Sequence, residues 1–306
     1  MRFIKLDLNL LVALDALLTE GSVTRAAEKV HLGQSAMSNA LTRLREYFDD
    51  DLLVQVGRKM EPTPRGMALK DPVRDVLIRI ESTVIAQPAF DPSQSDREFR
   101  LTVSDYTNAV LVPHLLELAH RQSSNVRFQL LPQADNPKRA LENGEVDLLI
   151  TPSQFVSDEH PSELLLSETF CCVIWRDSVL AHGAMTLERY LKQGHVVMEP
   201  SHSQSYETRE LEKQGIARRV EVKTFSFATA PRLVVGTSRI ATLHRRLAVQ
   251  AAAELPVTIK PLPMKIPALK QTMQWHKYRT NDLGLMWLRQ TLLQAVALMD
   301  SHKTLR

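Results

Sequence analysis

Two short helical segments, residues 23–30 and 34–48, are separated by only three residues, and this spacing narrows the folds open to the chain. Ser22 precedes the first segment and is a suitable N-cap, because its hydroxyl accepts a hydrogen bond from a free helix N–H. The adjacent Ala26 and Ala27 are small enough for another helix to cross closely. A preceding segment, residues 7–18, carries leucines at the helical period. Three helices around a glycine-containing turn predict a helix-turn-helix.

The segment 34–48 has two chemically different faces. Apolar residues recur at the helical period from Met37 to Phe48, which predicts a buried face. The opposite face carries short polar side chains and arginines, including Arg45, and such a face can approach and pair with base edges in the major groove. A solvated helix face in a bundle explains this segment, taken alone, equally well. The candidate base-reading residues are Gln34, Ser35, Ser38, Asn39, Thr42 and Arg43.

The residues that follow favour the DNA-binding interpretation. An alternating stretch at residues 54–56 leads into Gly57, and the chain returns to Pro62. This pattern predicts a β-hairpin wing with Arg58 and Lys59 at its tip. Basic side chains in that position hold backbone phosphates, which orients a protein on DNA without reading its sequence.

Charge and composition exclude several classes of protein. The formal net charge is +3, and the first 90 residues carry equal numbers of acidic and basic side chains, which argues against an architectural binder that recognises only phosphates. No run of about 18 apolar residues occurs, and no cleavage site follows the first apolar run, so we expect neither a membrane span nor a signal peptide. The two cysteines, Cys171 and Cys172, are adjacent and form no disulfide framework. We therefore expect a cytoplasmic protein.

Five motifs in the first 66 residues carry a resemblance to a known family. They are DLNLL at 7–11, SVTRAA at 22–27, QSAMSNALTRLR at 34–45, FDDDLL at 48–53 and PTPRG at 62–66. Together they resemble the LysR-type transcriptional regulators. The resemblance implies a winged helix-turn-helix in which Thr24 and Arg25 also face double-stranded DNA. It further implies self-association as a dimer or tetramer, a small-molecule effector, and RNA polymerase as a partner. We expect an activator, although the residues do not separate activation from repression.

A further helical pattern covers residues 65–85. Its apolar seam is narrow, as in a contact between two helices, and Pro72 is expected to kink the helix or mark its effective start. The seam either packs against its own domain or, as the resemblance implies, pairs with a second subunit. The seam residues are Val73, Val76, Leu77, Ile80 and Val84.

From residue 98 onwards, strand-like and helical patterns alternate, which predicts parallel α/β units. Gly144, Gly194 and Gly215 each precede a strand-like run and suit helix C-termini. One long helix is expected at 106–122. The predicted strands are 99–104, 126–131, 146–151, 170–175, 195–198, 219–224, 240–243, 258–262 and 271–276, and two further helices are expected at 136–142 and 282–299.

The expected fold class is therefore mixed: an α-rich winged helix-turn-helix and linker helix, followed by a two-lobed α/β domain resembling periplasmic binding proteins. The expected domains are a winged helix-turn-helix at 1–64, a linker or dimerisation helix at 65–86, a hinge linker at 87–97 and an effector-binding domain at 98–306. In the LysR family the chain leaves the first lobe, builds the second and returns. This organisation implies a first lobe at 98–163 and 266–306, and a second at 164–265.

Ligands of open α/β sheets bind at the carboxyl ends of strands, and polar residues follow two such strands. Two hydroxyl-rich helix N-termini facing each other would suit a carboxylate or phenolate, with aromatic walls beside it. The polar members either contact the effector or merely cap their helices. The candidate effector-binding residues are Ser104, Asp105, Tyr106, Thr107, His202, Ser203, Ser205, Phe225 and Phe227.

The carboxy-terminal half resembles a narrower branch of the family, that of NodD and NahR. The motifs are GTSRIATLHRRLA at 236–248, QWH at 274–276 and WLRQ at 287–290. The resemblance implies a small aromatic effector, flavonoid-like or salicylate-like.

Motifs of catalysis and of metal binding are not found. The sequence has no glycine-rich phosphate loop, no HExxH and no GxSxG. We therefore expect no cofactor, no metal and no enzymatic activity. An enzyme or a solute-binding protein with the same two-lobed fold is the alternative, and the fused helix-turn-helix argues against both.

Overall fold

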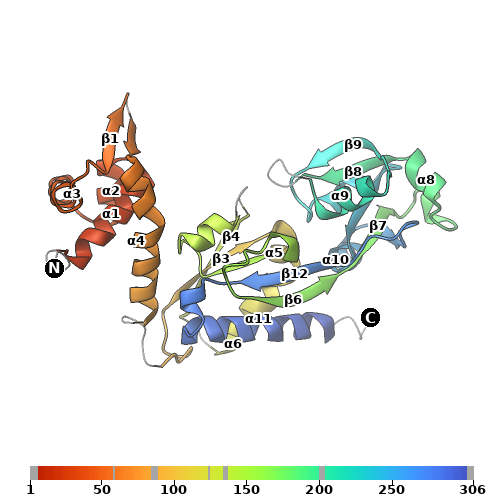
Figure 1. Cartoon of the computed structure of the whole chain (residues 1–306). Coiled ribbons are helices and arrows are strands. Elements are labelled where there is room, and N and C mark those ends of the chain that lie inside the picture. The colour runs from red at the N-terminus through yellow and green to blue at the C-terminus, as the bar shows by residue number, and fades with distance from the viewer. Residues whose placement is uncertain are drawn as a thin grey trace. The chain divides into compact units, whose positions relative to one another are not determined.

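The computed structural model describes residues 6–57, 59–83, 89–122, 125–133, 137–199 and 204–301. The chain divides into two compact units, residues 1–88 and 89–306 (Figure 1). In the described part of the chain, no helix has the length and apolar character needed to cross a membrane.

The first unit is a helix-turn-helix followed by a hairpin and a long helix. Ser22 caps the second helix by accepting a hydrogen bond from Arg25 N at 3.4 Å. The left-handed residue of the turn is His31, with φ of 55°, whereas Gly33 has an ordinary φ of −69°. The elements are α1 (Leu8–Glu20), α2 (Val23–Lys29), α3 (Gln34–Phe48), β1 (Leu53–Val56), β2 (Lys59–Pro62) and α4 (Pro64–Thr83). These elements confirm the predicted winged helix-turn-helix.

Helix α4 begins at Pro64 and continues through Pro72, so Pro72 does not start the helix. Arg74 attaches α4 to α1, because its guanidinium donates to Asp15 Oδ1 at 2.7 Å. Val73 and Leu77 pack into the apolar core of their own unit, while Val76 is 45% exposed. The predicted seam is therefore divided between intramolecular packing and an exposed face. Its last member, Val84, lies outside the described residues.

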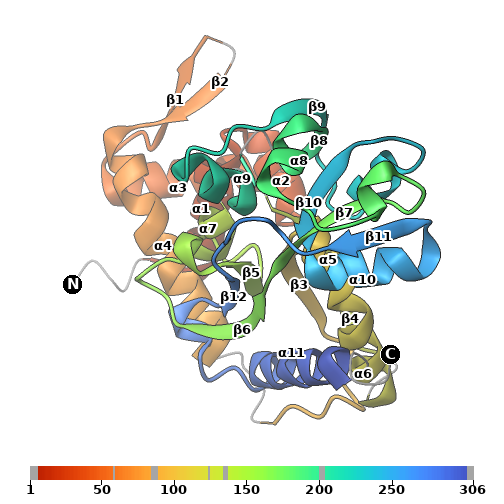
Figure 2. The same ribbon diagram turned by 90° about the vertical axis from the view of Figure 1, so that its right-hand side faces the viewer.

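The second unit contains two five-stranded sheets, and each sheet forms the centre of a lobe (Figure 2). In lobe 1 the order is β4-β3-β5-β12-β6. Strand β3 is parallel to β4 and β5, whereas β12 is antiparallel to β5 and β6. The lobe 1 strands are β3 (Glu98–Val103), β4 (Arg127–Pro132), β5 (Leu148–Pro152), β6 (Ser162–Glu168) and β12 (Leu269–Gln274). Its helices are α5 (Asp105–Val110), α6 (Val112–Gln122), α7 (Pro137–Glu142) and α11 (Leu283–Ser301).

In lobe 2 the order is β11-β7-β10-β8-β9. Strand β8 is parallel to β9 and β10, and β7 is antiparallel to β10 and β11. Both sheets therefore combine the predicted parallel strands with antiparallel ones. The antiparallel strands β6, β7, β11 and β12 lie where the chain passes from one lobe to the other. The strands are β7 (Phe170–Trp175), β8 (Gly194–Met198), β9 (Arg219–Thr224), β10 (Ile240–His244) and β11 (Val257–Lys260), and the helices are α8 (Leu187–Lys192), α9 (Tyr206–Lys213) and α10 (Arg245–Glu254).

Three local predictions for this unit were wrong. The expected helix 106–122 is broken at Leu111, because Pro113 has no N–H to continue the hydrogen-bond ladder. Gly194 follows the C-cap of α8 and begins strand β8 as expected, but it does not take the left-handed conformation, and a Cβ there would come within 2.1 Å of Glu221 Cδ. Strand β6 was not predicted, and it pairs with β12 in lobe 1. The chain consequently leaves lobe 1 near Thr169, later than the expected position near 163, and it returns between β11 and β12.

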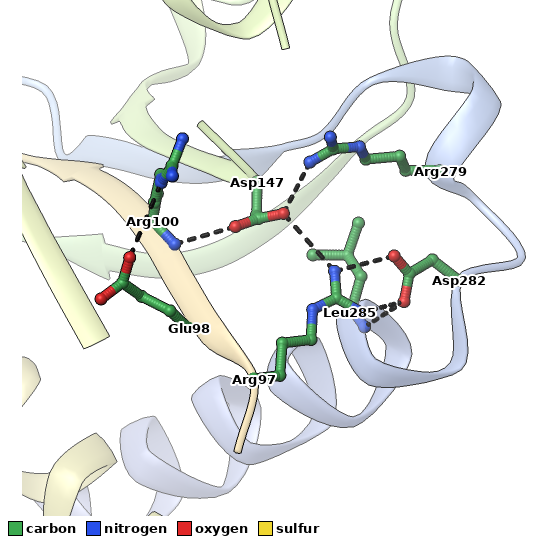
Figure 3. Close-up of polar contacts among 7 residues, drawn as sticks. All are labelled: Arg97, Glu98, Arg100, Asp147, Arg279, Asp282 and Leu285. Atoms are coloured by element: carbon green, nitrogen blue, oxygen red, sulfur yellow. Dashed lines mark hydrogen bonds and ion pairs between the residues drawn. The ribbon is translucent and has the colours of Figure 1, made fainter. Parts of the chain in front are cut away.

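An ion-pair network joins the start of lobe 1 to its last helix (Figure 3). Arg97 donates to both carboxylate oxygens of Asp282, at 2.6 and 2.8 Å. Asp147 accepts from Arg279 Nη1 at 2.6 Å and from Arg100 N at 2.8 Å. Burial alone would raise the pKa of Asp282, but the hydrogen bonds and charge of Arg97 outweigh it and lower that pKa. These contacts connect segments that are far apart in sequence, and they hold β3 and α11 in one lobe.

Candidate DNA-binding face and effector cleft

Helix α3 presents an exposed polar face. Met37, Leu41 and Leu44 are buried in the core of the first unit, which turns the other face of α3 to solvent. Thr42 donates to the carbonyl of Ser38 at 3.2 Å, one helical turn earlier. The exposed residues of α3 include all six candidates, namely Gln34, Ser35, Ser38, Asn39, Thr42 and Arg43.

Two arginines beside this face are engaged within the protein. Arg45 was expected on the polar face, but its guanidinium donates to the carbonyls of Asp51 and Leu53, both at 2.8 Å. Arg45 therefore holds the first strand of the hairpin. Arg25, which is exposed like Thr24, donates to the carbonyl of Glu20 at 2.5 Å.

The hairpin forms in the predicted place. Strands β1 and β2 are antiparallel, with Val56 opposite Lys59, and Gly57 takes the left-handed conformation with φ of 64°. Lys59 is exposed. Arg58 lies outside the described residues.

A cavity of about 460 Å³ opens between the lobes of the second unit. Lobe 1 contributes Tyr106 and Phe155, and lobe 2 contributes Arg209 and His244. The Arg209 guanidinium lies 4.9 Å from the centre of the Phe155 ring, which is a cation–π contact across the cleft. A volume of this size suits a small organic ligand held by both lobes.

The cavity has an aromatic wall. The rings of Tyr106 and His244 are stacked, with centroids 4.0 Å apart, and Phe227 meets His244 edge-on at 4.9 Å. The Tyr106 hydroxyl donates to Glu168, which also pairs with Arg246 at 3.1 Å. Burial and the neighbouring Glu168 raise the pKa of the Tyr106 phenol far above its usual range. Tyr106 is consequently a neutral, fixed ring.

Several predicted polar contacts have roles within the fold. Ser104 accepts a hydrogen bond from Thr107 N at 3.1 Å and caps α5, although it also lines the cavity. Thr107 is 1% exposed and does not line the cavity. Ser205 donates to Glu207 Oε1 at 2.5 Å.

Asp105 lines the cavity and bonds to lobe 2, accepting from Ser226 Oγ at 3.1 Å and Ala228 N at 2.9 Å.

The remaining predicted residues differ in position. Phe225 lines the cavity and is 80% exposed, so it lies at the rim, whereas Phe227 is buried. His202 and Ser203 lie outside the described residues.

Sequence reasoning missed Glu207, His244 and Gln271, which all line the cavity. Burial lowers the pKa of His244 to about 3 and raises the pKa of Glu207 to about 7, an effect that the Ser205 hydrogen bond partly offsets. His244 could have been found, because it ends strand β10 and ligands bind at carboxyl ends of strands. Gln271 lies on the returning antiparallel strand, which that rule does not cover.

The structure joins a winged helix-turn-helix to a two-lobed α/β domain with a ligand-sized cavity. This combination defines a transcriptional regulator that binds DNA and carries a small-molecule sensor. No cluster of three or more metal-ligating side chains occurs among the residues described.

Comparisons with known proteins agree with this class. Residues 8–67 match the bacterial regulatory helix-turn-helix protein of the lysR family, and residues 92–297 match the LysR substrate binding domain. The chain therefore belongs to the LysR family of transcriptional regulators.

Relatives of known sequence cover the whole chain. Nodulation protein D 1 of Rhizobium leguminosarum bv. phaseoli is 41% identical over 309 residues, covering 100% of this chain and 98% of that protein. Nodulation protein D 1 of Bradyrhizobium sp. (strain NC92) is 39% identical with the same coverage. These similarities confirm the resemblance to the NodD branch.

Solved structures share the fold. A probable transcriptional regulator from Pseudomonas aeruginosa is 28% identical, with a TM-score of 0.64 and coverage of 95% of this chain and 97% of that one. Full-length OxyR from Pseudomonas aeruginosa has a TM-score of 0.74 at 17% identity, covering 94% of each chain. The second likeness concerns the fold alone, and it confirms the two-lobed effector domain.

Proposed function

We propose that this LysR-type regulator reads a specific DNA site through the exposed face of α3 and responds to a small aromatic effector bound between its lobes. The observation that carries the effector class is the wall formed by Tyr106, His244 and Phe227. An aromatic ligand gains offset-stacked or edge-on contacts with such a wall beyond its apolar burial. Ser38 and Arg43 are the proposed centre of base reading, and Lys59 of the wing holds phosphate.

The proposed mechanism is a shift between arrangements of the two lobes. An effector that contacts both lobes binds one arrangement better than another, and the difference in affinity shifts the population. In a dimer or tetramer this shift changes the spacing of the DNA-binding units. The exposed apolar side chain of Val76, a member of the predicted seam, supports self-association through α4. The proposal includes a contact with RNA polymerase, by which the bound regulator activates transcription.

The proposal also places the chain in the cytoplasm, where its DNA target is, and assigns it no catalytic role. His244 contacts aromatic rings and makes no hydrogen bond to a serine in the described part of the chain.

A pair of probes with one carbon skeleton tests the effector class. We expect 4-hydroxybiphenyl to bind the full-length protein about two- to tenfold more tightly than 4-cyclohexylcyclohexanol, because only the first can stack. Isothermal titration calorimetry measures both affinities. Equal affinities would remove the aromatic assignment, and no binding of either would remove the cleft as the effector site.

A further inference from the structure

Two buried oxygens distinguish this cavity from the rest of the described structure. Among the residues described, only Glu207 Oε2 and Gln271 Oε1 are buried side-chain oxygens without a hydrogen-bond partner. Both residues line the cavity between the lobes. Buried polar atoms are almost always hydrogen-bonded, because an unpaired one retains its desolvation cost. Two such oxygens in one cavity indicate that a ligand supplies the missing partners.

The two oxygens come from opposite lobes. Glu207 lies in the first turn of α9 in lobe 2 and is 1% exposed, and its other oxygen is bonded to Ser205. Gln271 lies on β12 in lobe 1, between β5 and β6, and is 3% exposed. A ligand that reaches both atoms therefore connects the lobes directly.

Hydroxyl groups fit both positions. A hydroxyl donates to the amide oxygen of Gln271. Because burial raises the pKa of Glu207 to about 7, both forms of that carboxyl are populated near neutral pH. A hydroxyl donates to the ionised form and accepts from the protonated form, whereas a carboxylate ligand can only accept from the protonated one. At these two oxygens the cavity thus favours hydroxyls over carboxylates, while the Arg209 guanidinium, whose buried Nε also lacks a partner, is a separate donor in the lining.

We propose that Glu207 and Gln271 determine effector specificity, and that the accepted effector is an aromatic ring system whose two hydroxyl groups each bond to one lobe. The proposal rests on the aromatic effector site described above and adds the residues that read its polar groups. The serines at the two helix N-termini, Ser104 and Ser205, are engaged in local hydrogen bonds and contribute less to effector recognition. A doubly bonded effector favours the arrangement of lobes in which both oxygens are within reach.

A series of biphenyls tests the requirement for two hydroxyls. The probes are biphenyls with hydroxyls at 2,2′, 3,3′ or 4,4′, together with 4-hydroxybiphenyl and 4,4′-dimethoxybiphenyl, titrated calorimetrically into the full-length protein. The three isomers place their hydroxyls at different separations, and the dimethoxy compound keeps the oxygens without the donors. We expect one dihydroxy isomer to bind about tenfold more tightly than the monohydroxy probe, and the dimethoxy probe to bind more weakly still.

Variants test the two residues. Glu207→Met and Gln271→Met keep the side-chain length and remove the acceptor oxygen. Each is therefore expected to lower the affinity for the favoured dihydroxy isomer about tenfold. Gln204→Met is the matched control, because Gln204 lines the same cavity while its amide is bonded to Glu212 at 3.0 Å. The control is expected to bind like the wild type. Gln271→Met is expected to keep or raise the thermal midpoint, since it removes an unpaired buried atom, whereas Glu207→Met also loses the hydrogen bond from Ser205.

The outcomes separate this inference from the proposed function. If all the hydroxylated probes bind equally and the methionine variants change nothing, the inference is overturned while the aromatic cleft stands. Failure of 4-hydroxybiphenyl and of every dihydroxy isomer to bind overturns both. A large drop in the thermal midpoint of Gln271→Met also contradicts the inference, because it would show a structural partner for that oxygen.

Discussion

Asp105 in lobe 1 accepts a hydrogen bond from the Ser226 hydroxyl in lobe 2 at 3.1 Å, and the same oxygen accepts from Ala228 N at 2.9 Å. Asp105 is the first residue of α5, so its carboxylate also lies at the helix N-terminus, where the helix dipole stabilises negative charge. The sequence predicted Asp105 as an effector contact. In the structure it lines the cavity while joining the lobes, and we expect its loss to let them separate more readily.

Removing this carboxylate should loosen the contact between the lobes. In Asp105→Ala, the amide of Ala228 loses its acceptor, and hydrogen–deuterium exchange at Ala228 should become faster. A bond to a charged group contributes about 1.5–3 kcal/mol, which corresponds to roughly ten- to hundredfold faster exchange. Ser104→Ala is the control, since it removes a helix cap without touching Ala228. Unchanged exchange at Ala228 in Asp105→Ala would show that other contacts hold the lobes.

The two arginines at the end of α3 should behave differently on substitution. Arg45→Ala removes two hydrogen bonds to the carbonyls of Asp51 and Leu53, so we expect the first unit to lose about 2–4 kcal/mol of unfolding free energy. Arg43→Ala should change it by no more than about 0.5 kcal/mol, because the side chain is exposed. Urea unfolding followed by hydrogen exchange in α3 measures both. Similar losses in the two variants would contradict the roles assigned here.

The pair of Arg97 and Asp282 should make stability depend on acidity. The pKa of Asp282 is lowered from 3.8 in the fold, so the folded state binds its proton less readily than the unfolded chain does. The stabilisation is complete above the ordinary pKa and is lost as the pH falls through the lowered one. The difference in unfolding free energy between the wild type and Asp282→Asn should therefore be constant near pH 7 and shrink below about pH 4. A difference that stays constant down to pH 2 would rule out this linkage.

Local patterns in the sequence predicted the parts of the fold that local physics determines. Helix α3 begins at Gln34 and ends at Phe48 as predicted, because its apolar residues repeat along one helix. The wing was predicted from Gly57 and its flanking residues, because a β-hairpin is also determined by residues that are close in sequence. Strand β6 was missed because its place in the sheet depends on pairing with β12, more than a hundred residues away.

The cleft was only partly predictable. Tyr106 and Phe227 were proposed as its walls, and both line it. Pairing between distant residues determines the rest: Asp105 bonds to Ser226 in the other lobe, and Gln271 enters the cavity on the returning strand. Neither contact can be recognised from the residues next to it in the sequence.

The most direct test of the central claim is selection of bound fragments from the genome of the source organism. Purified full-length protein is compared with the double variant Ser38→Ala/Arg43→Ala, with and without an aromatic probe that binds the cleft. Each lost base contact costs about 1–3 kcal/mol, so specific enrichment should disappear in the variant while its thermal midpoint is retained. We predict that the wild type enriches intergenic fragments with two related half-sites and that the probe changes the enrichment. Equal enrichment by both proteins, or none by the wild type under either condition, would contradict sequence-specific reading by α3.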